Sequence, residues 1–241
     1  MAESGTLERF PDDITRVLAV VAHPDDMEYG ASAAVHHWTS AGVEVAYLLL
    51  TSGEAGMRSA PEVVGPLRAL EQRAACDAVG VEQLTILDHP DGTLMPTLEL
   101  RRDIARAIRQ FRPDVVVTGS WDVEAPWGLN QADHRAAGLA TLDACRDADN
   151  AWVFGELAEE GLEKWGATWL LVTGSDRPTH AVAVTDADVA AAVASLSAHR
   201  AYLADLPNHP APADFIPSML AAGGESLGEP FAVPFRAYRL R

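Results

Sequence analysis

The chain of 241 residues is poor in basic side chains and in cysteine, and it has no long apolar segment. Against 35 Asp and Glu it carries only 18 Lys and Arg, which gives a formal net charge of -17. Such a charge repels both nucleic-acid phosphates and anionic membranes, so we expect neither as a partner. The net charge does not exclude a small polar substrate, because the local field at a site matters more than the total charge.

Three further absences bear on the compartment. The two cysteines, Cys76 and Cys145, lack the spacing of a metal site and fall in apolar helical patterns, so we expect buried free thiols and a reducing environment. The acidic start of the chain has neither the basic residues nor the apolar core of a signal peptide. No apolar run approaches the roughly 20 residues that span a bilayer. These features predict a cytoplasmic protein.

The chain also lacks the glycine-rich fingerprint of dinucleotide-binding enzymes and a phosphate-binding P-loop. Strand and helix patterns nevertheless alternate, which predicts an α/β, Rossmann-like three-layer fold with a mostly parallel sheet and helices on both faces. The expected strands are 16–22, 43–51, 84–87, 114–118, 169–173 and 181–184. The expected helices are 28–41, 66–79, 98–111, 131–146 and 186–204.

No internal repeat or clean boundary divides the sequence, so we expect residues 1–241 to form a single domain. Its last part, from about residue 207 to residue 241, is rich in Pro, Gly and Ala. Proline and glycine interrupt regular structure, so this part is expected to be a tail that serves as a lid or a contact arm.

What the chain does contain is the run Ala-His-Pro-Asp-Asp, residues 22–26, directly after the first expected strand. Open α/β sheets place their ligand sites at the carboxyl ends of the strands. A polar turn in which Asp26 caps the next helix is the alternative interpretation. His134 follows the strand at 114–118 and its loop, so it is expected to face the same crevice as His23.

Two histidines and one carboxylate with an open fourth position make a catalytic zinc site, which activates a bound water and polarises a carbonyl. We therefore expect His23, Asp26 and His134 as metal ligands, with iron(II) as the alternative to zinc. Two adjacent carboxylates in an extended turn cannot point the same way, so Asp25 is expected to face the water as the general base. Asp133 is expected to cap its helix or to orient a ligand histidine.

These two motifs together resemble the PIG-L/LmbE family of zinc-dependent de-N-acetylases, over a span from about residue 17 to about residue 204. That family has a Rossmann-like fold. It includes enzymes that deacetylate N-acetylglucosaminyl-phosphatidylinositol, precursors of mycothiol and bacillithiol, and antibiotic glycosides. The resemblance implies a hydrolase that removes an acetyl group from a small N-acetylated substrate, an N-acetylglucosaminyl conjugate. It also leaves a homo-oligomer open.

Three further segments look like family motifs: the loop 51–56, the Arg-x-x-Glu at 68–71 and the Pro-Asp-Gly at 90–92. The resemblance implies that Glu54, Arg68 and Asp91 line the substrate pocket. Trp121 and Trp127 flank the loop before His134 and belong either to the core or to a sugar-stacking surface.

One position departs from the family pattern. The last motif usually begins with a histidine that stabilises or protonates the reacting amide, and here that position is Gln131. A glutamine can donate a hydrogen bond to an oxyanion, but it cannot deliver a proton at neutral pH. Gln131 is therefore a candidate catalytic residue. It also supports an alternative, in which the chain is a catalytically impaired metal- or sugar-binding member of the same fold.

Overall fold

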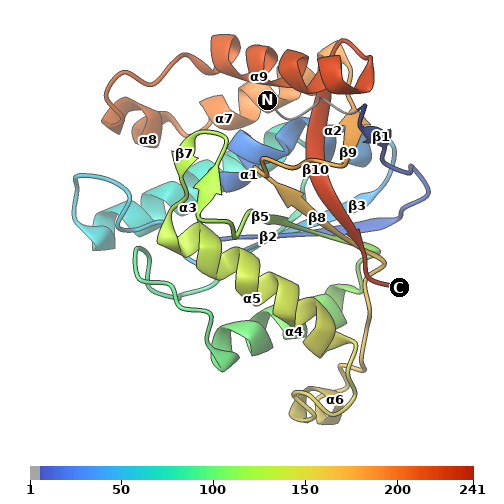
Figure 1. Ribbon diagram of the computed structural model, residues 1–241. Coiled ribbons are helices and arrows are strands. Elements are labelled where there is room, and N and C mark those ends of the chain that lie inside the picture. The colour runs from blue at the N-terminus through green and yellow to red at the C-terminus, as the bar shows by residue number, and fades with distance from the viewer. Residues whose placement is uncertain (1–5) are drawn as a thin grey trace.

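The computed structural model describes residues 6–241, and these are built around an eight-stranded sheet (Figure 1). The strand order is β1-β9-β10-β8-β5-β2-β3-β4. Every neighbouring pair is parallel except those of β10, which runs antiparallel to both β8 and β9. The strands are β1 Glu8–Arg9, β2 Arg16–Val21, β3 Glu44–Leu49, β4 Gln83–Ile86, β5 Val115–Gly119, β8 Trp169–Thr173, β9 His180–Ala183 and β10 Ala232–Arg239.

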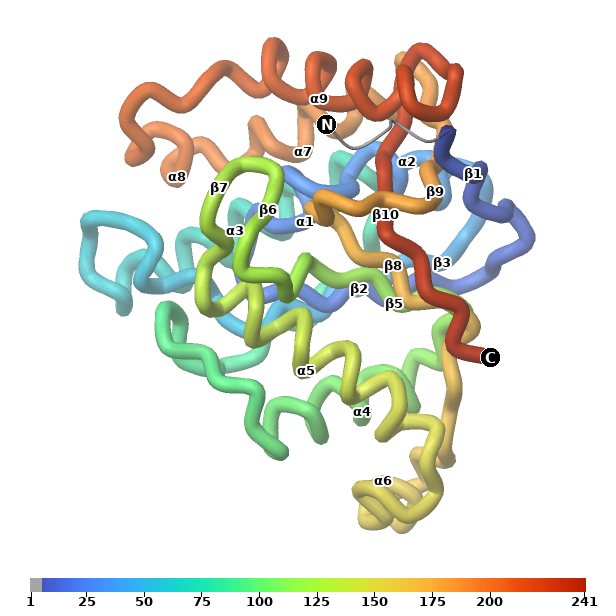
Figure 2. Tube along the Cα trace, viewed as in Figure 1, coloured from blue at the N-terminus to red at the C-terminus, as the bar shows by residue number. Residues whose placement is uncertain are grey.

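Helices cover both faces of this sheet, which confirms the predicted α/β three-layer fold (Figures 1 and 2). One face carries α1 Asp26–Gly30, α2 Ser32–Ser40, α3 Pro61–Ala78, α7 Asp186–Ser197 and α9 Pro212–Leu227. The opposite face carries α4 Leu98–Phe111, α5 Ala132–Ala148 and the short α6 Glu156–Glu159. The remaining elements are α8 Arg200–Asp205 and a small hairpin of β6 Glu124–Ala125 and β7 Gly128–Leu129.

Strand β2 shows why both faces must be covered. Its side chains alternate between the two faces, as the pleat of a strand requires, and all of them from Val17 onward are buried. The odd-numbered residues pack into one hydrophobic core and the even-numbered residues into the other. Cys76 lies in the first core and Cys145 in the second, and both are buried free thiols as predicted.

Two expected helices are interrupted. The helix expected over 28–41 divides at Ala31, where the backbone leaves the helical region. The helix expected over 186–204 divides at Ala198 and His199 into α7 and α8. The division at His199 places its side chain fully inside the protein, with Nε2 at 3.7 Å from Oε2 of the buried Glu28.

The expectation of a tail over 207–241 is wrong. This segment contains α9 and then β10, which occupies a position inside the sheet between β9 and β8 (Figure 1). Val233 and Phe235 of β10 are almost fully buried. The C-terminal segment is therefore part of the core and of one layer of the fold.

Residues 6–241 include no helix that is both long and apolar enough to cross a membrane.

Candidate active site

A cavity of about 700 Å³ lies at the carboxyl ends of β2, β5 and β8, as the parallel sheet predicts. Its polar end is formed by the turn after β2 and by the start of α5. The hairpin β6–β7, helices α8 and α9 and strand β10 contribute the remaining walls. Its volume falls within the range of about 300–1,000 Å³ that is usual for small-molecule sites.

His23, Asp26 and His134 converge at the polar end of this cavity. Their ligand atoms all lie within 4.8 Å of one another. Asp26 Oδ1 is 3.0 Å from His134 Nε2, and Asp26 Oδ2 is 3.7 Å from His23 Nδ1. Zinc binds nitrogen and oxygen ligands at about 2.0–2.2 Å, so two ligands of one ion lie no further apart than about twice that distance. Both of these separations satisfy that condition.

Neighbouring groups fix which nitrogen of each imidazole faces this point. The amide nitrogen of Asn130 donates to the carbonyls of Ser120 and Asp122, so its Oδ1 accepts from Nδ1–H of His134 at 3.2 Å. Nε2 of His134 then keeps its lone pair toward Asp26. An imidazole whose second nitrogen is held by a hydrogen-bond partner is the usual arrangement of a metal-ligating histidine.

His23 is held in the same way from its other side. Its Nε2 lies 2.9 Å from Asp91 Oδ1 and 3.5 Å from Asp133 Oδ2, which leaves Nδ1 for the shared point with Asp26. Asp91 and Asp133 form a second acidic cluster with His23. However, backbone amides of Ala55, Gly92 and Leu94 already donate to these two carboxylates. The cluster with Asp26 and His134 is therefore the better metal site.

The charges of the site also favour a bound cation. Burial lowers the pKa of His23, but the carboxylates around it outweigh that effect and raise its pKa to about 12. The pKa of His134 is also raised, because Asp26 outweighs the effect of burial. The surrounding carboxylates thus stabilise positive charge at both imidazoles. A divalent ion supplies that charge, so the donor set fits a metal.

Asp25 lies next to this cluster in an uncommon backbone conformation. Its φ of 90° lies in the left-handed region, which non-glycine residues seldom adopt. The side chain of Gln72 accepts from the Asp25 amide at 3.0 Å, and Arg68 donates to the Asp25 carboxylate at 3.0 Å. Burial raises the pKa of Asp25 to about 6, although Arg68 opposes the shift. These contacts hold a buried carboxylate, with a pKa close to neutral, beside the metal cluster.

The family model described as PIG-L, GlcNAc-PI de-N-acetylase, matches residues 18–145, more than half of the chain. The chain belongs to this family. It is 34% identical over 139 residues to the diacetylchitobiose deacetylase of Thermococcus kodakarensis, covering 55% of this chain and 50% of that protein. It is 32% identical over 192 residues to the 1D-myo-inositol 2-acetamido-2-deoxy-alpha-D-glucopyranoside deacetylase of Kineococcus radiotolerans, covering 62% and 52%.

The chain thus spans about half the length of the curated relatives it matches. Among solved structures, the N,N'-diacetylchitobiose deacetylase of Pyrococcus horikoshii superimposes with a TM-score of 0.81 at 22% identity. That superposition covers 94% of this chain and 85% of the other. At this identity it shows a shared fold.

Of the three residues that the PIG-L resemblance assigned to the substrate pocket, two line the cavity and one does not. Asp91 and Arg68 line the cavity, whereas Glu54 is absent from its lining. Glu54 instead accepts from the backbone amide of Asp91 and from Ser52, so it shapes the loop beneath Asp91. Arg68 is buried and donates to the carbonyls of Pro24 and Gly53 as well as to Asp25. Its contacts position the turn after β2.

Gln131 lines the cavity at the start of α5 and is exposed. Of the two tryptophans, Trp127 lines the cavity from the hairpin, while Trp121 stacks on Tyr238 and packs against the core. The expected sugar-stacking role therefore fits Trp127 alone.

Several residues of the site carried no signal in our sequence analysis. Tyr202 of α8 stacks over the Arg68 guanidinium at 4.2 Å, and the hydroxyl of Tyr29 lies 2.6 Å from His209 Nε2. These contacts join segments more than a hundred residues apart, which no local pattern indicates. Asn130 lies just before α5 and four residues before His134, so of these residues it is the one close to a predicted ligand along the chain.

Proposed function

We propose that this chain is a metal-dependent N-deacetylase that hydrolyses the acetamide of an N-acetylglucosaminyl conjugate. The observation that carries the proposal is the convergence of His23, Asp26 and His134 at the polar end of the cavity, with the buried carboxylate of Asp25 beside them. Membership of the PIG-L family and the names of the two curated relatives support the acetyl group and the amino sugar as substrate features.

His23, Asp26 and His134 would hold the ion, which supplies a Lewis acid that polarises the amide carbonyl and lowers the pKa of the attacking water. Asp25 takes a proton from that water as its oxygen adds to the carbonyl carbon. Asp25 then returns the proton to the amide nitrogen as the carbon–nitrogen bond breaks, which releases acetate and a free amine. Arg68 and Gln72 hold the Asp25 side chain and backbone in place during this transfer.

Gln131 supports a second candidate function, a binding protein with impaired catalysis, because its amide cannot deliver a proton. The two candidates differ in one respect that can be measured. If Gln131 acts as a neutral donor to the oxyanion, Gln131→Ala lowers kcat by about 10²- to 10³-fold, the usual cost of removing such a donor. If the chain only binds its ligand, both forms release no acetate.

The first experiment is a measurement of metal content together with activity. Zinc and iron per chain are quantified in protein purified without chelator, and acetate release from N-acetylglucosaminides is then assayed with and without added metal. We expect about one ion per chain and metal-dependent acetate release. A bound ion without acetate release would favour the binding protein, and the absence of metal after reconstitution would contradict the site.

A matched pair of variants tests the ligand assignment. His134→Ala is expected to lose the ion. His89→Ala is expected to keep it, because Nε2 of His89 lies 3.1 Å from Asp103 and His89 is absent from the cavity lining.

A further inference from the structure

The cavity has an apolar end that the proposed deacetylation does not use. Six residues of the cavity lining carry no charged group and, apart from the indole nitrogen of Trp127, no nitrogen or oxygen atom in their side chains. They are Trp127 of the hairpin, Phe215, Met219 and Leu220 of α9, and Val233 and Pro234 of β10. The same continuous cavity therefore joins a polar reaction centre to an apolar compartment.

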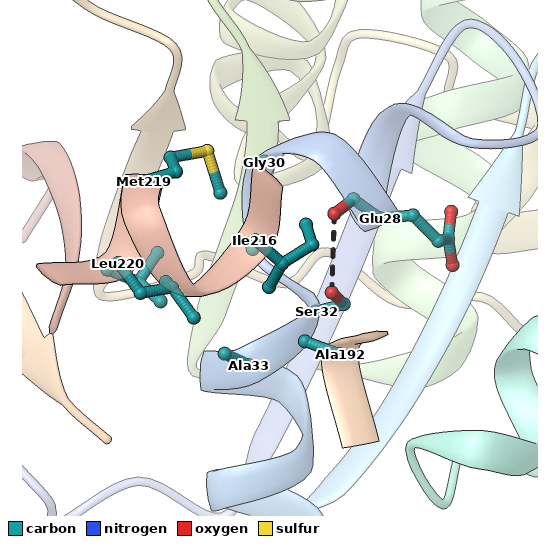
Figure 3. A pocket seen from close by; sticks show the side chains of 10 residues that line it. Glu28, Gly30, Ser32, Ala33, Ala192, Ile216, Met219 and Leu220 are labelled. Atoms are coloured by element: carbon teal, nitrogen blue, oxygen red, sulfur yellow. Dashed lines mark hydrogen bonds between the residues drawn. The ribbon is translucent and has the colours of Figure 1, made fainter. Parts of the chain in front are cut away.

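The packing behind this compartment closes it (Figure 3). Ile216, Met219 and Leu220 of α9 lie against Gly30 and the start of α2, and the crevice between them has no room for a water-sized molecule. The carboxylate of Glu28 points away from α9 (Figure 3). Among residues 6–241, Glu28 is the one charged residue that lines this crevice, and its carboxylate accepts from Gln72 and Ser195.

Aromatic rings border the compartment on two sides. Trp127 is 62% exposed although its indole lines the cavity, so a large apolar surface is left at the mouth. On the other side the rings of Tyr29 and Phe215 meet edge to face at 5.9 Å, and His209 packs against both. The His209 Nε2 is already engaged by the Tyr29 hydroxyl at 2.6 Å. Such surfaces favour a flat or aliphatic ligand over an ionic one.

The cavity lining, within residues 6–241, offers no uncommitted Lys or Arg. Arg68 is the single Lys or Arg in that lining, and its side chain is 3% exposed and bound to Asp25 and two backbone carbonyls. Asp25, Asp26 and Asp91 line the cavity as well. A phosphate or carboxylate on the substrate would lose its hydration here without gaining the charged donor that proteins use to bind such groups.

We infer that the site selects N-acetylglucosaminides whose aglycone, the group joined to the sugar, is uncharged and apolar, an aryl or alkyl group. This inference rests on the proposed deacetylase function. The acetamide lies at the metal cluster, and the aglycone occupies the compartment between Trp127 and Met219. A polyol or a second sugar is disfavoured, because those of its hydroxyl groups that face these six side chains would lack hydrogen-bond partners.

The test compares four classes of probe. They are the two anomers of phenyl N-acetylglucosaminide, N,N'-diacetylchitobiose, N-acetylglucosaminyl-inositol and N-acetylglucosaminyl-malate. We expect kcat/KM for one phenyl anomer to exceed that of every other class by about tenfold or more, as burial of an apolar ring provides. Equal or higher kcat/KM for the malate, inositol or disaccharide probe would overturn the inference.

Two variants connect this preference to the compartment. Trp127→Ser is expected to raise KM for the phenyl glycoside about tenfold, and by a larger factor than it raises KM for N-acetylglucosamine itself. Trp152→Ser is the matched control, because Trp152 is 91% exposed and outside the cavity lining. Met219→Lys is expected to raise kcat/KM for the malate conjugate. A phenyl preference that neither cavity variant alters would place the aglycone elsewhere and contradict the inference.

Calorimetric binding of the same probes separates this inference from the proposed function. If no probe releases acetate, the deacetylase proposal fails, and the inference then stands or falls on whether the phenyl glycoside binds more tightly than the charged and polyol probes. If acetate is released but without this preference, the deacetylase proposal holds and the inference fails. Binding of none of the four classes contradicts the inference.

Discussion

Asp25 is the residue whose local structure bears most directly on the proposed chemistry. Its backbone adopts a left-handed conformation, which costs a non-glycine residue on the order of 1–3 kcal/mol. Gln72 and Arg68 stabilise that conformation by binding the Asp25 amide and carboxylate. The carboxylate is therefore held in one position next to the metal cluster, as a general base requires.

We predict that Asp25→Asn lowers kcat for acetate release by about 10²- to 10⁴-fold, because the amide cannot accept the proton. Asparagine tolerates the left-handed region better than alanine, so this variant separates loss of the base from backbone strain. The measurement is acetate release together with metal content, which should stay at the wild-type value.

Asp77→Asn is the control for this substitution, because the Asp77 carboxylate is 69% exposed on α3 and pairs with Arg73 at the surface. Wild-type turnover in Asp25→Asn would assign the base to another residue. Loss of the ion in the same variant would instead make Asp25 a ligand.

At the residue scale, the sequence predicted the groups that lie close together along the chain or at the ends of neighbouring strands. His23 and Asp26 are three residues apart, and His134 reaches them because β2 and β5 are adjacent and parallel. Arg68 was expected to line the substrate pocket, and it does line the cavity, but the sequence did not indicate that it also donates to the turn after β2. The reason is that a guanidinium has several donors, and only the folded chain shows which acceptors surround it.

At the element scale, helix α7 begins with a capping box that also anchors a neighbouring helix. Asp188 accepts from the Thr185 amide and hydroxyl, and His36 of α2 lies 2.6 Å from its carboxylate. Burial raises the pKa of Asp188, but the Thr185 amide and His36 outweigh that effect, so the pKa is lowered. The ionised carboxylate therefore stabilises the folded state.

We predict that Asp188→Asn lowers the free energy of unfolding at pH 7 by about 1–3 kcal/mol. A carboxyl with a lowered folded-state pKa stabilises the protein above its unfolded pKa of about 3.9 and loses that contribution as the pH falls through the folded value. The difference between wild type and variant should therefore shrink below about pH 4. Urea denaturation from pH 7 downward measures it.

Asp186→Asn serves as the comparison, since Asp186 is exposed in the first turn of the same helix. A pH-independent difference for Asp188→Asn would show that hydrogen bonds, rather than ionisation, stabilise this helix start.

Also at the element scale, α9 and β10 show why part of the fold escaped the sequence pattern. Gly223 and Gly224 stand inside α9, where a Cβ atom would lie 2.3 Å and 2.4 Å from carbonyl oxygens of Ala232 and Glu229. Glycine is required because the helix packs directly on the backbone that leads into β10. Pro234 lies within a strand that has neighbours on both sides, where proline is rare. The glycines of this segment, which suggested a tail in the sequence, are thus explained by the close packing of α9 on β10.

At the scale of the whole molecule, β10 joins β9 and the edge strand β1 to the rest of the sheet. Phe235 of β10 is fully buried and stacks on Trp38 of α2 with a centroid distance of 6.2 Å. We predict that Phe235→Ala lowers the free energy of unfolding by about 3–5 kcal/mol, the usual cost of such a core deletion. Trp152→Ala, at a highly exposed position, should change it by less than about 0.5 kcal/mol.

Denaturant unfolding followed by circular dichroism measures both changes. If Phe235→Ala cost no more than Trp152→Ala, the C-terminal strand would not belong to the cooperative core, and the predicted single domain over residues 1–241 would have to be divided.

The two thiols report whether the layers of the molecule unfold together. Cys76 and Cys145 lie in cores on opposite faces of the sheet, and burial raises the pKa of each thiol to about 12. At pH 8 about one folded thiol in ten thousand is then the reactive thiolate, against about a quarter for an unperturbed thiol. Labelling by a thiol reagent must therefore proceed through opening of the core.

We predict that Cys76→Ala and Cys145→Ala proteins, each with one remaining thiol, are labelled at the same rate in native buffer and that this rate equals the rate of global unfolding. Faster labelling of one thiol would show that its layer opens alone, and the sheet would then separate two units of different stability.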